Sequence, residues 1–160
     1  MKTIYIKLSL LLLAFCMTVG VSGQSIRNDE GKELARMLTD NSFEMVHAGV
    51  VSYKLENGKF IMLFNNIPHE LGSVGSYERS DSKIQYYNKE GDMIGYYVLG
   101  EGRFYRVTAN VRRVVKEETA ATILDGILLR NDGEGATTKF TVDNNFDPTV
   151  IGFILFYIIG

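Results

Sequence analysis

The last twelve residues of the chain, TVIGFILFYIIG (149–160), contain no charged side chain, and any fold of this chain must bury or anchor them. We call this run the C-terminal tail. As a helix it would be about 18 Å long, whereas the hydrocarbon core of a bilayer is about 30 Å thick, so it is too short to span a membrane. Asp147 and Pro148 before it form a recognised helix start, an N-cap followed by proline at the first helical position. Its four isoleucines and Val150 suit a central strand equally well.

Three interpretations of the tail remain. The favoured one is a buried element, helix or strand, that completes the hydrophobic core. The second is a glycolipid-anchor signal, because small residues and a polar spacer precede the tail, although Glu134 interrupts the small residues. The third is membrane contact, or assembly with other chains, through residues 149–160.

The beginning of the chain has the pattern of a secretory signal peptide. Lys2 and Lys7 precede and flank an apolar block (8–15), and the small residues Val21-Ser22-Gly23 suit a cleavage site. We therefore predict a signal peptide over residues 1–23 and a single mature domain over residues 24–160. A lipoprotein signal at Cys16 is less favoured, because a bulky phenylalanine precedes the cysteine.

Export and composition limit the kind of protein this is. Cleavage removes two lysines and no acidic residue, so the formal charge falls from −2 to −4. It also removes the only cysteine, and the exported domain must be held by packing without disulfides. We expect a periplasmic, cell-envelope or extracellular location. The acidic balance argues against nucleic acid as a partner, although there is one basic cluster: Arg103, Arg106, Arg112, Arg113 and Lys116.

Two segments of the mature domain have helical spacing of apolar residues. The first covers roughly residues 30–40, with Asn28 or Asp29 as its cap. The second covers residues 118–130, where an apolar stripe repeats at three and four residues. The tail, taken as a helix, would be a third.

The remaining segments alternate with a period of two, which is typical of strands. Asn57-Gly58 is a strong hairpin signal before KFIMLF (59–64). Further strands are predicted at 43–55, 83–87, 93–99, 103–111 and 137–142. The predicted fold is α+β: an antiparallel sheet of about five or six strands, with an N-terminal helix and one or two C-terminal helices packed on it.

The pattern also predicts which side chains share a sheet face. In the strand 103–111, Tyr105 and Val107 belong to the apolar face, and Arg106 and Thr108 to the polar face. Tyrosines occur as neighbours at 86–87 and 96–97, so each pair presents one ring to each face. One ring of each pair is expected in the core, and the other in an exposed aromatic strip.

The segment 65–82 is rich in Gly, Ser and Asn and is predicted to be a long binding loop. It contains His69 beside Glu70, the pair most available for function. The candidate binding residues are His69, Glu70, Tyr77, Tyr87 and Tyr97.

The sequence predicts no catalytic, cofactor or metal site. His69-Glu70 lacks the second histidine of a zinc HExxH motif, and His47 lies in an apolar strand, where a structural role is favoured. The acidic and amide residues at 143, 145 and 147 alternate like the first ligands of a calcium loop, but the glycine and the distant glutamate are missing.

These observations favour a non-catalytic binding or structural module that meets a protein or small-molecule partner. One alternative is a small hydrolase-like enzyme that uses His69 with Glu70 or Asp81 as an acid/base pair. The other is a membrane-associated or assembling protein that uses the tail.

We expect the mature protein to begin at Gln24 and to lie outside the cytoplasm of its native host, because a lysine-flanked apolar block is followed by a small-residue cleavage site. N-terminal sequencing of the protein from that host checks this. Recovery of an uncleaved chain starting at Met1 in the cytoplasm would contradict it.

Overall fold

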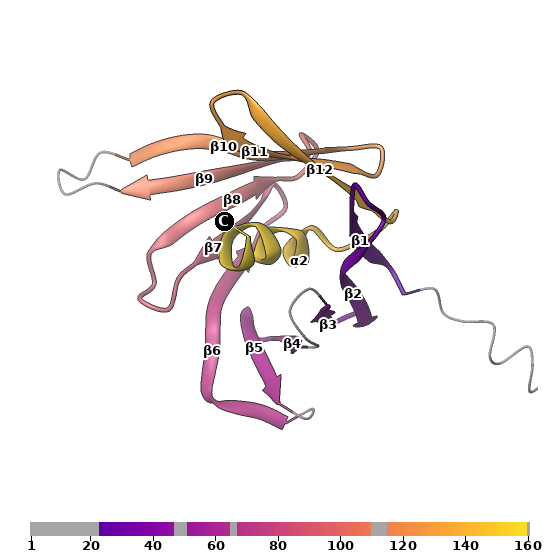
Figure 1. The fold of residues 1–160 in the computed structure, drawn as a ribbon. Helices are drawn as coiled ribbons and strands as arrows, with labels where there is room; N and C mark the ends of the chain where they lie inside the picture. Colours follow the sequence, from indigo (N-terminus) through magenta and orange to yellow (C-terminus); the bar gives the residue numbers. More distant parts are fainter. Residues whose placement is uncertain (1–22, 47–50, 65–66, 110–114, 160) are drawn as a thin grey trace, which may run out of the picture.

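The computed structural model describes residues 23–159 except 47–50, 65–66 and 110–114. The described residues form a closed antiparallel barrel with the strand order β1-β12-β11-β10-β9-β8-β7-β6-β5-β4-β3-β2 (Figure 1). The strands are β1 Ser25–Asn28, β2 Glu33–Thr39, β3 Ser42–Met45, β4 Val51–Glu56, β5 Lys59–Phe64, β6 Ile67–Arg79, β7 Lys83–Tyr87, β8 Met93–Val98, β9 Arg103–Ala109, β10 Val115–Leu124, β11 Ile127–Gly133 and β12 Ala136–Val142. The α+β prediction with five or six strands is therefore wrong.

The predicted N-terminal helix is a β-hairpin. Asn28, expected to cap a helix, instead closes the β1–β2 turn: its side-chain oxygen accepts a hydrogen bond from Lys32 N at 2.8 Å. Gly31 in the same turn has a φ of 78°, which a glycine adopts without steric cost. Asn and Asp favour turns for the same reason that they favour caps, because their side chains bond nearby backbone groups.

The predicted helix at 118–130 is also a hairpin, made by β10 and β11. Asp125 and Gly126 both have positive φ, 49° and 75°, and Leu124 pairs with Ile127, so two residues form a tight turn of the type that Asp-Gly favours. Leu124, a member of the proposed helical stripe, is 70% exposed. A bulge near Ala120 buries two consecutive alanines, Ala120 and Ala121, and this broke the period of two in the sequence.

The predicted single strand 43–55 is wrong, because β3 and β4 within it pair antiparallel with each other. The following strand predictions are confirmed. Asn57 and Gly58 form the β4–β5 turn, with φ values of 51° and 72°, and β5 and β7 have the predicted bounds. The predicted long loop 65–82 is mostly the strand β6, whose bulges against β5 accommodate its glycines and serines. The predicted leader (except Gly23), His47, Arg112 and Arg113 lie outside the described residues.

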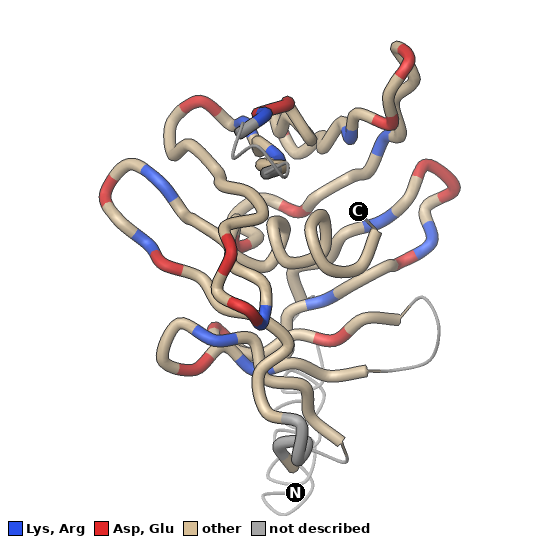
Figure 2. The backbone as a smooth tube through the Cα atoms, turned by 90° about the vertical axis from the view of Figure 1, so that its left-hand side faces the viewer, with Lys and Arg blue, Asp and Glu red and all other residues tan. Residues whose placement is uncertain are grey.

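The C-terminal tail lies inside the barrel. It forms the helix α2 (Pro148–Phe153) and continues as a π-helical turn, η1 (Ile154–Ile158). Asp147 caps α2 by accepting a hydrogen bond from Thr149 N at 2.9 Å, as the sequence predicted. Figure 2 shows this helix in the centre of the ring of strands, without a charged residue, while the charged residues lie on the strands and turns around it. Within the described residues, no helix has the length and apolar character needed to cross a membrane.

Aromatic side chains join the tail to several walls of the barrel. Phe153 is 1% exposed, and its ring centre lies 5.3 Å from Phe43, 4.9 Å from Tyr53 and 4.6 Å from Phe60. On another side, Phe156 lies 5.1 Å from the ring of Tyr86. The tail is thus a core element, in agreement with the favoured interpretation of its sequence.

Three glycines allow this close approach. A Cβ atom at Gly75 of β6 would collide with the ring of Tyr157. A Cβ atom at Gly95 of β8 would collide with the ring of Phe156, and one at Gly152 of α2 would collide with the ring of Tyr86. The Tyr86 hydroxyl donates a hydrogen bond to Pro148 O at 2.9 Å. Tyr157 similarly donates to Tyr87 O at 2.6 Å, and burial raises the pKa of Tyr157 to about 12. The tail is held by fitted packing and by buried hydroxyl contacts.

Asp143 fastens the first strand to the last. Its carboxylate accepts hydrogen bonds at 2.9 Å from both the backbone N and the hydroxyl of Ser25, and it pairs with Arg27 at 3.2 Å. Partial burial opposes ionisation of this carboxyl, but the Ser25 hydrogen bonds and the Arg27 charge outweigh it and hold the pKa of Asp143 below its usual value.

We expect Phe153→Ala to lower the free energy of unfolding by about 3–5 kcal/mol, because it leaves a cavity among the core rings. Ile158→Ala in the same tail is the matched control: Ile158 is 40% exposed, so its loss should cost about 1 kcal/mol. Denaturant unfolding of the mature protein measures both. If both variants lowered the free energy of unfolding by the same amount, Phe153 would not be packed in the core of the barrel.

We expect Asp143→Asn to destabilise the protein at neutral pH, and the difference from the unsubstituted protein to disappear in acid. A carboxyl whose folded-state pKa is depressed stabilises the fold above its unfolded pKa of about 3.9 and stops doing so as the pH falls through the folded value. Thermal midpoints between about pH 7 and pH 2 measure this. Asp29→Asn, in the exposed β1–β2 turn, is the control, and its thermal midpoint should stay close to that of the unsubstituted protein at every pH. If the Asp143→Asn midpoint were lower by the same amount down to the lowest pH, the carboxylate of Asp143 would not stabilise the fold through Ser25 and Arg27.

Candidate functional site

Two hollows among the described residues lie at opposite ends of the tail. One, which we call the mouth pocket, includes Ile159, just after η1, and the other includes Asp147, just before α2. Because the tail fills the space between them, a ligand can reach the ends of the barrel but not its centre.

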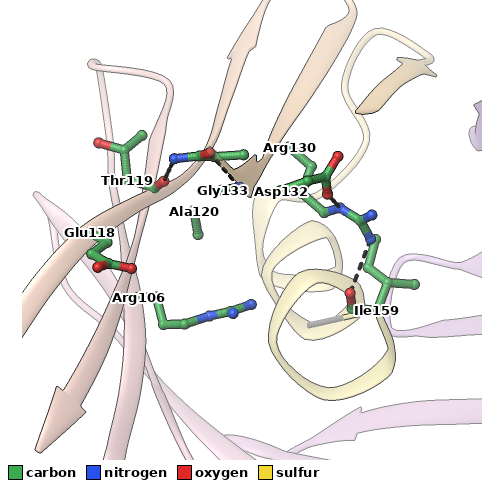
Figure 3. A pocket seen from close by; sticks show the side chains of 9 residues that line it. Arg106, Glu118, Thr119, Ala120, Arg130, Asp132, Gly133 and Ile159 are labelled. Atoms are coloured by element: carbon green, nitrogen blue, oxygen red, sulfur yellow. Dashed lines mark hydrogen bonds and ion pairs between the residues drawn. The ribbon is translucent and has the colours of Figure 1, made fainter. Parts of the chain in front are cut away.

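The mouth pocket has a volume of about 330 Å³ (Figure 3). Three neighbouring strands and the end of the tail build it. Its lining residues are Arg106 from β9, Glu118, Thr119 and Ala120 from β10, Arg130, Asn131, Asp132 and Gly133 from β11, and Ile159. All of these residues except Ile159 belong to hydrogen-bonded strands of the barrel.

Arg106 points into this pocket because of the alternation in β9. Phe104, two residues earlier, is fully buried, so Arg106 shares the inner face with it. Figure 3 shows the Arg106 guanidinium directed into the pocket, towards Arg130 and the end of the tail. The alternation in the sequence predicted the opposite arrangement, with Tyr105 on the apolar inner face. Tyr105 instead stacks on Tyr96 outside, with ring centres 5.0 Å apart.

Arg130 joins the pocket wall to the tail. Its Nε atom donates to Asp132 Oδ1 at 2.6 Å, its Nη1 atom donates to Ile159 O at 3.0 Å, and its guanidinium lies 5.8 Å from the ring centre of Phe140. Asp132 also accepts from the hydroxyl of Thr138 at 2.6 Å. The Thr138 hydrogen bond, with that of Arg130, outweighs desolvation and holds the pKa of Asp132 below its usual value.

The second carboxylate of the pocket is also paired. Glu118 lies opposite Arg106 in the strand register, but its ion pair is with Lys116. The hydrogen bond and the charge of Lys116, with a smaller contribution from Arg106, lower the pKa of Glu118. Asn131 is fixed as well, because its amide donates to Thr119 O at 3.1 Å and accepts from Gly133 N at 3.0 Å.

The hollow at the other end has a volume of about 350 Å³ and lies beside the predicted start of the mature chain, at Gly23 and Gln24. Two acidic residues, Asp40 and Asp147, line it. Asp147 caps α2 and pairs with Arg79 at 3.4 Å. Asp143 nearby in sequence is engaged by Ser25 and Arg27. The carboxylates of Asp143 and Asp147 therefore serve the fold. Among the described residues, no group of three or more potential ligands is placed to hold a metal ion.

The candidate residues predicted from the sequence do not lie together in the structure. His69 and Glu70 lie near the start of β6, and Asp81 follows its end. The ten residue-to-residue steps from His69 to Arg79 correspond to roughly 30 Å along the strand. Tyr77, on the same strand, is half-buried with its ring centre 5.0 Å from that of Phe60.

The tyrosine pairs divide between the faces as predicted. Tyr86 and Tyr97 are buried, at 0% and 7% exposure, so the candidate Tyr97 lies in the core, 4.4 Å from the Phe104 ring centre. Tyr87 is outside and donates to Glu78 at 3.1 Å. Tyr96, also outside, has the ammonium of Lys83 4.6 Å from its ring centre. The outer rings and the core rings therefore do not form one site.

Sequence reasoning missed the two residues that dominate the mouth pocket. Arg106 was grouped with its basic neighbours, although Arg103, three positions away in the same strand, lies on the opposite face. Arg130 was taken for the end of a helix. The usable signal was Asp125-Gly126, because this turn places β11 beside β10. Arg130 then pairs with Ala121, whose partner on β9 is Phe104, two residues before Arg106.

No protein-family model, curated protein or solved structure matches the chain. The proposals below therefore depend on the geometry of the mouth pocket.

Proposed function

We propose that the protein is an exported, non-catalytic binding module that takes a small ligand in the mouth pocket. The leader supports export, and the barrel supports binding at its surface rather than in its centre. The observation that carries the proposal is the tail: it fills the barrel and leaves an open, polar hollow at its end.

The residues of the pocket suit binding better than proton transfer. A guanidinium has five N–H donors and no hydrogen-bond acceptor, so Arg106 and Arg130 suit the donation of hydrogen bonds to a ligand. Both pocket carboxylates are engaged by cations of the chain, and their pKa values lie below the usual range. General acid/base catalysis near neutral pH needs the opposite, a carboxyl whose pKa is raised.

The hydrolase alternative needs side chains that meet. That alternative uses His69 with Glu70 or Asp81. Asp81 follows the opposite end of β6 from His69, and none of the three residues lines the mouth pocket. The geometry therefore favours the binding module over an acid/base pair of His69 and Asp81, and His69 with Glu70 is tested by the variant below. A pocket of about 330 Å³ is within the range of small-molecule sites, at its lower end.

A nuclear magnetic resonance screen of the ¹⁵N-labelled mature protein tests the proposal. The library should contain small acids, amines, sugars and short peptides. We expect compounds that bind to shift the backbone amides of β9, β10 and β11 around the mouth pocket, and to be recovered unchanged after prolonged incubation.

Two results would overturn it. Shifts that gather at the start of β6 or in the hollow beside Gln24, with none at the mouth, would place binding elsewhere. Conversion of a bound compound, lost in a His69→Ala variant, would establish the enzyme alternative instead.

A further inference from the structure

We infer that the mouth pocket is an oxyanion site, in which the guanidinium of Arg106 holds the carboxylate, phosphate or sulfate group of a compact small molecule. The inference rests on the proposed function and adds the chemical class of the ligand. Three observations support it: the charge balance of the pocket, the position of Arg106, and the size of the hollow.

The charge balance leaves one cation for a ligand. Arg130 is neutralised by Asp132 at 2.6 Å, and Glu118 by Lys116. Arg106 is the remaining charge of the pocket, and within the described part of the chain it makes no hydrogen bond or ion pair. A guanidinium fork matches the oxygens of a carboxylate or phosphate and binds them through two parallel hydrogen bonds.

The neighbours of Arg106 leave its inner side open. Its register partner on β8 is Gly95, which has no side chain and is covered by the ring of Phe156. Its partner on β10 is Glu118, which is turned to Lys116. Figure 3 accordingly shows the guanidinium pointing across the hollow rather than along the strand. A ligand group placed there would meet the arginine fork directly.

The walls restrict what accompanies the anionic group. Ala120 and Ile159 supply apolar surface, whereas Glu118 and Asp132 are each paired with a cation of the chain. These two pairs leave only the charge of Arg106 to balance a ligand, so a single anionic group is preferred to a polyanion.

Titrations of the mature protein with acetate, inorganic phosphate and sulfate, at constant ionic strength, test the inference. Methylammonium is the control probe of opposite charge. We expect saturable shifts of the β9–β11 amides and of the Arg106 side chain with at least one oxyanion, and none with methylammonium. The relative affinities of acetate and phosphate then distinguish a carboxylate ligand from a phosphate or sulfate ligand.

Variants of one strand make the test specific. Arg106→Gln should weaken oxyanion binding at least about tenfold, because a charge-assisted pair of hydrogen bonds is lost. Arg103→Gln removes the same charge from the outer face of β9 and should leave binding unchanged. Arg106→Lys keeps the charge without the fork and should bind with intermediate strength; it also serves if the glutamine variant fails to fold.

The outcomes separate this inference from the proposed function. If compounds from the screen bind at the mouth with equal affinity in the unsubstituted protein and in Arg106→Gln, the oxyanion inference is wrong and the binding module stands. If oxyanions shift residues around Arg103 instead, only unspecific surface charge is involved and the inference is wrong. If nothing at all binds the mouth, both proposals fall.

Discussion

The packing of the C-terminal tail inside the barrel is the interaction on which the rest of the structure depends. Eight strands already enclose a space just wide enough for their own side chains, and larger barrels enclose more. Twelve strands therefore need a filler, and the helix α2 with η1 supplies it. A helix that is apolar on every side is stable only where every side is covered, which explains why the last twelve residues contain no charge.

Because the tail occupies the interior of the barrel, it also limits where a ligand can bind. The interior that other wide barrels offer to ligands is occupied here by Phe153, Phe156 and their neighbours. What remains is the end of the barrel, and the tail itself forms part of that wall, because Arg130 binds Ile159 O. The mouth pocket therefore forms only when the tail is docked in the barrel. Asp143, which fastens the first strand to the segment after the last one, belongs to the same folded structure.

The sequence predicted those features that depend on neighbouring residues. Asn57-Gly58 and Asp147-Pro148 determine the local backbone, and both formed the predicted turn and helix start. The segments 30–40 and 118–130 were mistaken for helices, because bulges that bury adjacent residues imitate a helical period. The inner and outer faces of β9 were predicted the wrong way round for another reason. In this part of the barrel the polar Arg106 lies on the inner face and the aromatic Tyr105 on the outer face. Only the closed register, a long-range property, shows that Arg106 faces inward.

The two arginines of the mouth pocket have different tasks, and the helix explains the division. The last carbonyl groups of a helix lack partners within it and carry partial negative charge, so they attract a cation. Arg130 meets this need at Ile159 O while Asp132 balances its charge. The carbonyl that would otherwise attract Arg106 is thereby satisfied. Arg130 therefore completes the fold, and its neighbour Arg106 keeps its guanidinium in the open hollow, where an external anion supplies the partner that the tail does not.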